Sequence, residues 1–144
     1  MANTPHNVYL FVHAIWATGE RTKLLRKPIR TLFFPAIRKM AADKGIKIIA
    51  LNGAEDHIHC VFHLLPAQNL LQVVNSVKQD SANWLNETHL IPELFSWEAG
   101  YSAYTVSPGG LKQVTDYLLK QEEYHGSRTL ENELEIFEKS KPEY

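Results

Sequence analysis

The apolar residues of this chain repeat with two spacings, one typical of strands and the other of helices. Segments rich in β-branched and aromatic residues, which favour strands, occupy residues 7–17, 46–51, 58–65 and 95–106. Apolar residues three and four positions apart, which favour amphipathic helices, cover residues 28–45, 69–86, 111–124 and 130–139. The spacing therefore predicts the order β-α-β-β-α-β, followed by two more helices.

Glycine and proline separate several of these segments. Asn52-Gly53 stands between the second and third predicted strands, where it favours a tight connection and an antiparallel pair. Pro108-Gly109-Gly110 separates the fourth strand from the third helix and offers a hinge there. Pro35 lies inside the first predicted helix, which it either ends or bends because proline lacks a backbone donor.

The predicted order is that of a split βαβ arrangement, the ferredoxin-like or RRM-like fold of the α+β class. Such a fold has one antiparallel sheet with two helices covering one face, and the other face is free for a substrate or for added elements. Here the added elements are the third and fourth predicted helices. A chain of 144 residues has room for one such core, so we predict a single domain over residues 1–144.

The composition is typical of a globular protein, with 44% hydrophobic and 22% charged residues. No apolar run is long enough to span a bilayer, and residues 1–6 do not resemble a signal peptide. We therefore expect a cytoplasmic protein with no membrane partner. Cys60 is the single cysteine, which excludes an intrachain disulfide and a cysteine-based zinc site.

The net charge of −1 conceals a basic segment near the N-terminus. Five basic residues fall within ten positions there: Arg21, Lys23, Arg26, Lys27 and Arg30. Their combined field favours phosphate groups, although a solvated surface without a ligand gives the same pattern.

A His-x-His sequence lies at the start of the third predicted strand. Because side chains alternate along a strand, His57 and His59 share one face while Ile58 and Cys60 face the other way. Two neighbouring imidazoles can bind one divalent cation, which then needs at least one more protein ligand. The alternative is a pair of structural histidines that only form hydrogen bonds. We interpret the remaining histidines as structural and keep one of them, His63, as a reserve ligand.

A tyrosine and a glutamine lie four residues apart in the third predicted helix. Tyr117 and Gln121 therefore share a helical face. The side-chain carbonyl of Gln121 is a candidate third ligand for the cation, and the hydroxyl of Tyr117 is a candidate nucleophile. A surface helix whose tyrosine hydroxyl reaches water is the alternative.

Together these motifs resemble the single-tyrosine HUH (TnpA-type) transposases of small bacterial insertion sequences. The resemblance rests on His57-Ile58-His59 after Asp56, on Trp97-Glu98-Ala99-Gly100-Tyr101, and on the segment from Tyr117 to His125. These resemble the family's His-hydrophobic-His motif, its Trp-Gln-x-Gly-Tyr strand, and its Tyr-Ile-x-Asn-Gln-x-x-His-His helix. The resemblance covers nearly the whole chain.

The resemblance implies a metal-dependent DNA transposase. His57, His59 and Gln121 would bind Mg²⁺ or Mn²⁺. Tyr117 would attack a phosphate of single-stranded DNA to form a 5′-phosphotyrosine and a free 3′-hydroxyl, and strand joining would reverse this step without ATP. The family also implies a homodimer that binds hairpin ends of single-stranded DNA, with the five basic residues named above and Lys78 contacting phosphates.

Two alternatives stay open on the sequence alone. A non-cleaving module of the same fold that binds single-stranded DNA or RNA hairpins needs no nucleophile, so the intact Tyr117 argues against it. Tyr124 lies on about the same helical face as Tyr117 and is an alternative nucleophile. The chain also departs from the family motifs, because Glu98 stands where glutamine is usual and Lys120 where asparagine is usual. Trp97 either stacks on an unpaired base or packs in the core.

Overall fold

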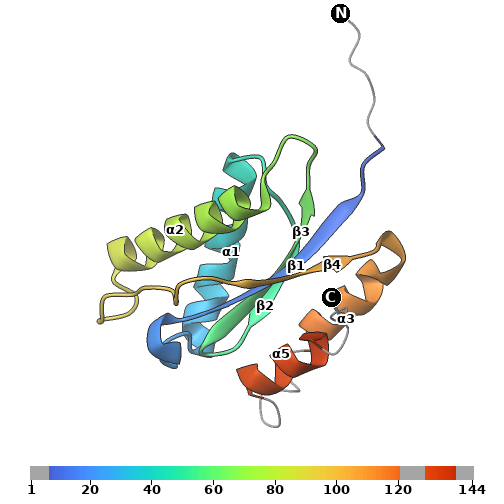
Figure 1. Cartoon of the computed structure of the whole chain (residues 1–144). Helices are drawn as coiled ribbons and strands as arrows, with labels where there is room; N and C mark the ends of the chain where they lie inside the picture. The colour runs from blue at the N-terminus through green and yellow to red at the C-terminus, as the bar shows by residue number, and fades with distance from the viewer. Residues whose placement is uncertain (1–6, 121–128, 139–144) are drawn as a thin grey trace, which may run out of the picture.

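The computed structural model describes residues 7–120 and 129–138 of the chain. It contains one antiparallel sheet with the strand order β2-β3-β1-β4 (Figure 1). The strands are β1 (Leu10–Ala17), β2 (Lys47–Gly53), β3 (His57–Leu64) and β4 (Ser102–Val106). This order, with the first and third strands side by side in the centre, confirms the predicted split βαβ fold of the α+β class.

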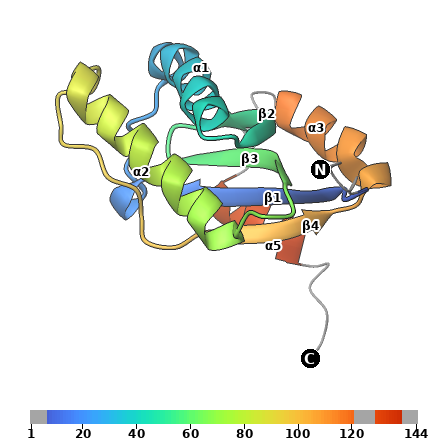
Figure 2. The same ribbon diagram turned by 90° about the horizontal axis from the view of Figure 1, so that it is seen from above.

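Helices lie on both faces of the sheet. α1 (Lys27–Asp43) and α2 (Leu70–Thr88) cover one face, as predicted for this fold (Figure 2). α3 (Leu111–Leu119) and α5 (Leu130–Glu138) lie against the other face. Within the two described ranges, no helix has both the length and the apolarity that crossing a membrane requires.

The main hydrophobic core lies between the sheet and helices α1 and α2. Ile58 and Phe62 of β3 point into it and are at most 1% exposed, as the predicted alternation requires. Phe33 of α1 is fully buried and stacks on the ring of Trp97, whose Nε1 donates to Oγ of Ser81 at 3.0 Å. Of the two interpretations of Trp97, core packing is therefore the one that the structure supports.

One predicted strand is shorter in the structure, and the helix that contains Pro35 is continuous. The strand predicted over residues 95–106 begins only at Ser102, because Gly100 has a φ of 85° and turns the chain out of the extended conformation. Pro35 does not end α1, which continues past it. The proline lies on the exposed side of the helix, where water can reach the carbonyl of Thr31 that loses its helical donor.

Helix α3 covers the second face of the sheet near β2 and β3. Its Leu118 is buried against Ala50 of β2 and Val61 of β3. Asn52 of β2 donates a side-chain hydrogen bond to the carbonyl of Leu118, at 2.7 Å. The apolar contact positions the helix and the hydrogen bond satisfies a carbonyl near its C-terminal end, so Tyr117 is held over the sheet.

Helix α5 covers the same face near β1. Its Leu130 is 3% exposed and packs with Leu134 and Phe137 against Ile15 and Ala17 of β1. A buried leucine contributes about 1.5–3 kcal/mol of transfer free energy, so this apolar stripe fixes α5 on the sheet. The side chains of β3 that project between α3 and α5 form the candidate site.

Candidate active site

Two histidines of β3 project from the second face of the sheet toward α5. His57 is 2% exposed and His59 is fully buried. The Nε2 atoms of both rings lie within hydrogen-bond distance of one oxygen, Oε2 of Glu133 in α5, at 2.6 Å for His57 and 3.2 Å for His59. The two imidazoles therefore converge, and the point on which they converge holds a carboxylate oxygen.

The tyrosine of α3 meets the same carboxylate. Tyr117 donates a hydrogen bond from its hydroxyl to Oε1 of Glu133 at 2.8 Å. Its ring packs edge-on against Phe137, with 5.7 Å between the centroids, and lies 6.1 Å from the His59 ring. One carboxylate thus joins the candidate nucleophile to both histidines within a single chain.

The predicted third metal ligand, Gln121, lies outside the described residues, as do Tyr124 and His125. Among residues 7–120 and 129–138, three side chains bring possible ligand atoms within 4.8 Å of one another: His57, His59 and Glu133. Two imidazole nitrogens and one carboxylate oxygen suit a divalent ion such as Mn²⁺, and suit Mg²⁺ less well because Mg²⁺ prefers oxygen ligands. The donor set therefore fits a cation of the kind that the resemblance implies.

A second layer of polar groups orients the two imidazoles. Oδ1 of Asp56 lies 2.7 Å from Nδ1 of His57, and Nε2 of the buried His13 in β1 lies 2.8 Å from Nδ1 of His59. Ligand histidines in metalloproteins are usually held in this way, through the ring nitrogen that does not face the cation. Both Nε2 atoms are therefore directed toward Glu133.

Hydrogen bonding keeps this cluster charged although it is buried. Burial opposes the imidazolium form of His57, but the hydrogen bonds to Asp56 and Glu133 outweigh it and raise the pKa of His57 above its usual value. Burial likewise opposes the carboxylate form of Glu133, but the hydrogen bonds from His57 and His59 outweigh it and hold the pKa of Glu133 far below its usual value. Without a bound cation, we therefore expect a His57 imidazolium between two carboxylates.

The pKa of the neighbouring His13 favours its neutral form. Burial, and secondly the proximity of His59, lowers the pKa of His13 to about 3. A neutral imidazole has one donor and one acceptor nitrogen, so Nε2 of His13 can accept a hydrogen bond from the Nδ1–H of His59 when Nε2 of His59 binds a cation.

The chain matches one protein family over most of its length. The family is described as IS200-like transposase, and its model matches residues 7–121. This chain belongs to the IS200-like transposases. The family resemblance that the sequence motifs indicate is thereby confirmed.

Known relatives of this transposase point to the same family. The ISDra2 transposase TnpA of Deinococcus radiodurans is 25% identical over 114 residues, which are 76% of this chain and 81% of that protein. A crystal structure of a candidate transposase from Deinococcus radiodurans R1 is 26% identical, has a TM-score of 0.64, and the match covers 84% of this chain and 98% of the other. A REP-associated tyrosine transposase bound to a REP hairpin shares the fold, with a TM-score of 0.59, 16% identity, and coverage of 87% of this chain and 75% of that one.

Two predicted phosphate-binding residues of the transposase lie beside the histidines. Lys23 and Lys27 are exposed and line a cavity of about 470 Å³. Asp56 and His57 line the same cavity. Arg26 is also exposed, at the start of α1. The basic segment therefore flanks one side of the candidate site.

Two other predicted DNA contacts have partners inside the fold. Arg30 is 7% exposed and donates from Nη1 to the carbonyl of Leu25 at 2.6 Å. Lys78 donates from Nζ to the carbonyls of Glu98 and Gly100, at 3.0 and 2.8 Å. In this conformation both side chains hold backbone segments of the transposase in place.

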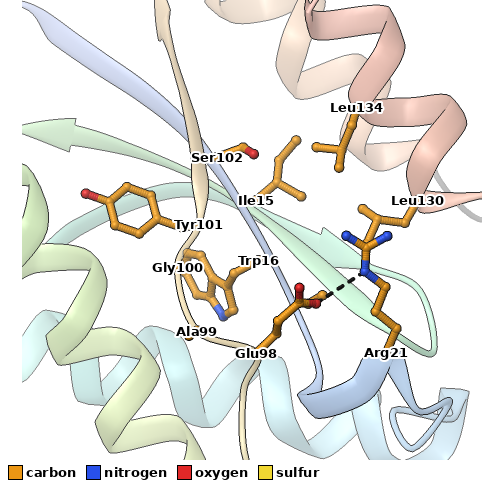
Figure 3. A pocket seen from close by; sticks show the side chains of 11 residues that line it. Ile15, Trp16, Arg21, Glu98, Ala99, Gly100, Tyr101, Ser102, Leu130 and Leu134 are labelled. Carbon is orange, nitrogen blue, oxygen red and sulfur yellow. Dashed lines mark hydrogen bonds and ion pairs between the residues drawn. The ribbon is translucent and has the colours of Figure 1, made fainter.

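Arg21, the remaining basic residue of the segment, links α5 to the segment before β4. Its Nε donates to Oε2 of Glu98 at 3.2 Å, and its Nη1 donates to Glu131 in the first turn of α5. Figure 3 shows the Arg21–Glu98 ion pair beside a cavity of about 170 Å³ that Leu134 of α5 also lines. Glu98, which stands where the family motif usually has glutamine, supplies the negative charge for this pair.

The sequence motifs do not include Glu133, although the sequence contains a signal for it. In the last helix, Leu130, Leu134 and Phe137 form an apolar stripe, and Glu133 lies on the same helical face. A carboxylate on such a stripe indicates either poor packing or a buried polar partner. The partner His57 is 76 positions away in the chain, so no local pattern connects the two residues.

Proposed function

We propose that this transposase cleaves and rejoins single-stranded DNA at insertion-sequence ends through a covalent bond to Tyr117. The observation that carries the proposal is the convergence of the Tyr117 hydroxyl and two imidazoles on one carboxylate. A phenol beside a cation site can act as a nucleophile toward a phosphate that the cation polarises. Membership of the IS200-like family supports the same chemistry.

In the proposed reaction, Oη of Tyr117 forms a bond to the phosphorus of one phosphodiester. The bond from phosphorus to the 3′ oxygen breaks, and this oxygen takes up the proton that the phenol loses. The products are a 5′-phosphotyrosine and a free 3′-hydroxyl. Because one ester replaces another, the 3′-hydroxyl of a second strand can reverse the step and join strands without ATP.

His57 and His59 are the proposed protein ligands of a Mg²⁺ or Mn²⁺ ion, with Gln121 as a proposed third ligand. When bound, such an ion supplies a Lewis acid that offsets the negative charge of the reacting phosphate. Asp56 and His13 orient the two imidazoles through the hydrogen bonds to their Nδ1 atoms. The rings are therefore preorganised before DNA binds.

Phosphates of the DNA strand are proposed to bind Lys23 and Lys27. Both lysines share a cavity with His57, so a strand bound there has a phosphate close to the proposed ligands. Arg26 extends the same exposed basic segment. The related transposase bound to a REP hairpin supports a hairpin as the form of DNA that is recognised.

A homodimer and a cytoplasmic location stay predictions. Within one chain, α3 brings Tyr117 to 6.1 Å from its own His59, measured between ring centroids. This proximity supports a site that forms within one chain. The proposed homodimer would then serve to hold two DNA ends together.

Covalent capture of DNA tests the proposed function. A 3′-labelled single strand from an insertion-sequence end should transfer its label to the protein in Mn²⁺, because the 5′-phosphate side stays on the tyrosine. The same strand labelled at its 5′ end should give only a shorter labelled strand. Tyr117→Phe should lower the protein-bound label by on the order of 10³-fold or more, because the nucleophile is lost.

The matched control is Tyr9→Phe, since Tyr9 is 60% exposed and lies outside the histidine cluster. A denaturing gel should show as much covalent protein–DNA product for this variant as for the wild type. Undiminished labelling of Tyr117→Phe would transfer the role of nucleophile to another residue, with Tyr124 as the first candidate. Hairpin binding without any covalent product would instead favour the non-cleaving module.

A further inference from the structure

The carboxylate of Glu133 lies at the centre of the site although no sequence motif contains it. We propose that Glu133 completes the site, with Oε2 as a protein ligand of the divalent cation and Oε1 positioning the hydroxyl of Tyr117. This inference rests on the proposed function and adds a residue to it. It also makes α5 a part of the active site rather than only a cover for the sheet.

The fold gives Glu133 a fixed place. Leu130 and Leu134 lie on either side of it in α5 and pack onto β1. Arg21 donates a hydrogen bond to Glu131, in the first turn of the same helix, and so ties that turn to the segment that follows β1. Apolar packing and an ion pair therefore set the position of the carboxylate, and the residue belongs to a regular helix.

Burial shows that Glu133 is not an ordinary surface glutamate. Its side chain is 1% exposed, and both of its oxygens have polar partners. A buried carboxylate costs stability unless it is paired, whereas an apolar residue would continue the α5 stripe without that cost. The residue is best explained by the groups that it contacts, which include two candidate cation ligands and the candidate nucleophile.

The two oxygens of the carboxylate have different partners. Oε2 lies 2.6 Å from Nε2 of His57, which is a hydrogen-bond distance, and a cation bound by both atoms would displace the proton between them. Oε1 accepts the hydrogen bond from Tyr117 at 2.8 Å. A carboxylate that binds a cation through one oxygen can still accept a hydrogen bond on the other. Glu133 can therefore hold the phenol at a set distance from the cation.

Glu133 and Gln121 differ in what they offer a cation. The amide of Gln121 is neutral, whereas the carboxylate carries a negative charge, and affinity for a divalent ion rises with the charge of its ligands. We therefore expect Glu133 to contribute more than Gln121 to cation affinity in the protein without DNA.

A competing role for Glu133 would have the opposite signature. If the carboxylate only filled the cavity of the resting protein, it would compete with the cation and with the DNA phosphate. Its removal would then strengthen cation binding and speed covalent capture. The two roles are separated by the sign of these changes.

A titration of the full-length protein with Mn²⁺ alone tests the ligand role. Electron paramagnetic resonance measures the free ion in this titration. Glu133→Gln keeps the size of the side chain but removes its charge, and we expect it to weaken Mn²⁺ binding by at least about 10-fold. Glu135→Gln, at an exposed position of the same helix, is the matched control and should bind Mn²⁺ as the wild type does. Unchanged or tighter binding by Glu133→Gln would overturn the ligand role.

Glu133→Asp distinguishes a lost ligand charge from misfolding as the cause of weaker Mn²⁺ binding. The shorter side chain keeps the charge, so it should bind Mn²⁺ more tightly than Glu133→Gln does, with circular dichroism showing that both variants fold. Equal Mn²⁺ affinity of the two variants would count against the ligand role, because a negative charge that contacts the cation should raise the affinity.

Single-turnover covalent capture tests the positioning of Tyr117. At saturating Mn²⁺, Glu133→Ala lacks both oxygens and should form the product at least about 10-fold more slowly, with hairpin affinity unchanged. An unchanged rate would overturn the positioning role. A wild-type protein that binds Mn²⁺ through Glu133 but never forms a covalent product would instead reject the proposed function and leave the ligand role standing.

Discussion

His57 shows most directly how single residues determine the behaviour of the site. It lies between Asp56 and Glu133, with a carboxylate oxygen 2.7 Å from Nδ1 and another 2.6 Å from Nε2. Without a cation, the raised pKa of His57 favours a proton on both nitrogens. A cation that binds Nε2 would displace the proton from that nitrogen. The proton on Nδ1 would stay there, in its hydrogen bond to Asp56. Proton and cation therefore compete for one nitrogen of His57.

The shifted pKa values of His57 and His13 predict that the cation-free protein is most stable near pH 6.5, which is the usual pKa of a histidine. The pKa of His57 is raised, so its contribution is complete below that pH and is lost as the pH rises through the folded-state value. The pKa of His13 is lowered to about 3, so the unfolded chain takes up that proton first and stability falls below pH 6.5. Urea unfolding between pH 5 and 9 in chelator measures both effects, each with a limiting slope of about 1.4 kcal/mol per pH unit.

The matched variant for this measurement is His57→Asn. It should remove the loss of stability above pH 6.5 and keep the loss below it, which comes from His13. A wild-type protein whose stability still rises from pH 7 to 9 in chelator would contradict the charged His57 in the folded state.

At the residue scale, the sequence predicts only part of the cluster. His57 and His59 can be paired because strand alternation places both on one face. Glu133 and His13 reach the cluster through tertiary contacts from α5 and β1. The register that sets His13 opposite Val61 of β3 is decided by sheet packing, which a pattern within one strand does not contain.

Helix α5 is the element in which packing and chemistry are combined. Helical spacing over residues 130–139 predicts this helix, and the structure has it at Leu130–Glu138. The surface on which it packs does not follow from the sequence, because an amphipathic stripe can pack against any apolar face. Strand β4, in contrast, is shorter than its sequence predicts. The composition of residues 95–106 favours a strand throughout, but the left-handed backbone of Gly100 restricts the strand to Ser102–Val106.

Loosening α5 should therefore weaken the site without unfolding the sheet. Leu130→Ala removes a side chain that is 3% exposed and should lower the stability of α5 packing by about 2–5 kcal/mol. Amides of α5 should then exchange hydrogen faster while those of β3 stay protected, and Mn²⁺ binding should weaken along with the position of Glu133.

The control on the same helix is Ile136→Ala, because Ile136 is 42% exposed. It should change neither hydrogen exchange nor Mn²⁺ binding by a comparable amount. Slow exchange of α5 in Leu130→Ala would show that the apolar stripe does not hold the helix in place.

Over the whole molecule, the sheet has the main hydrophobic core on one face and the candidate site on the other. Helices α1 and α2 bury the main core on one face, and α3 and α5 enclose the histidines on the other. The order of elements could be predicted because each strand and helix has its own local spacing. The sequence does not specify that α3 folds back onto its own sheet, since the same helix could pack on a second copy of the chain.

A mixture of two variant chains tests this arrangement. A mixture of Tyr117→Phe and His59→Ala chains should form no covalent DNA product, because a site that forms within one chain then always lacks either the nucleophile or a ligand. Each variant alone is the control and should also be inactive. Recovery of covalent capture in the mixture would show that α3 completes the site of a second chain.

The family match ends at residue 121, and Glu133 lies beyond it. A shortened chain that kept only the shared stretch would retain both imidazoles and the phenol but would lose the acid that joins them. If Glu133 is a ligand as proposed, changes confined to α5 would alter how tightly the site binds a divalent ion, while β3 and α3, which carry the histidines and Tyr117, would stay as they are.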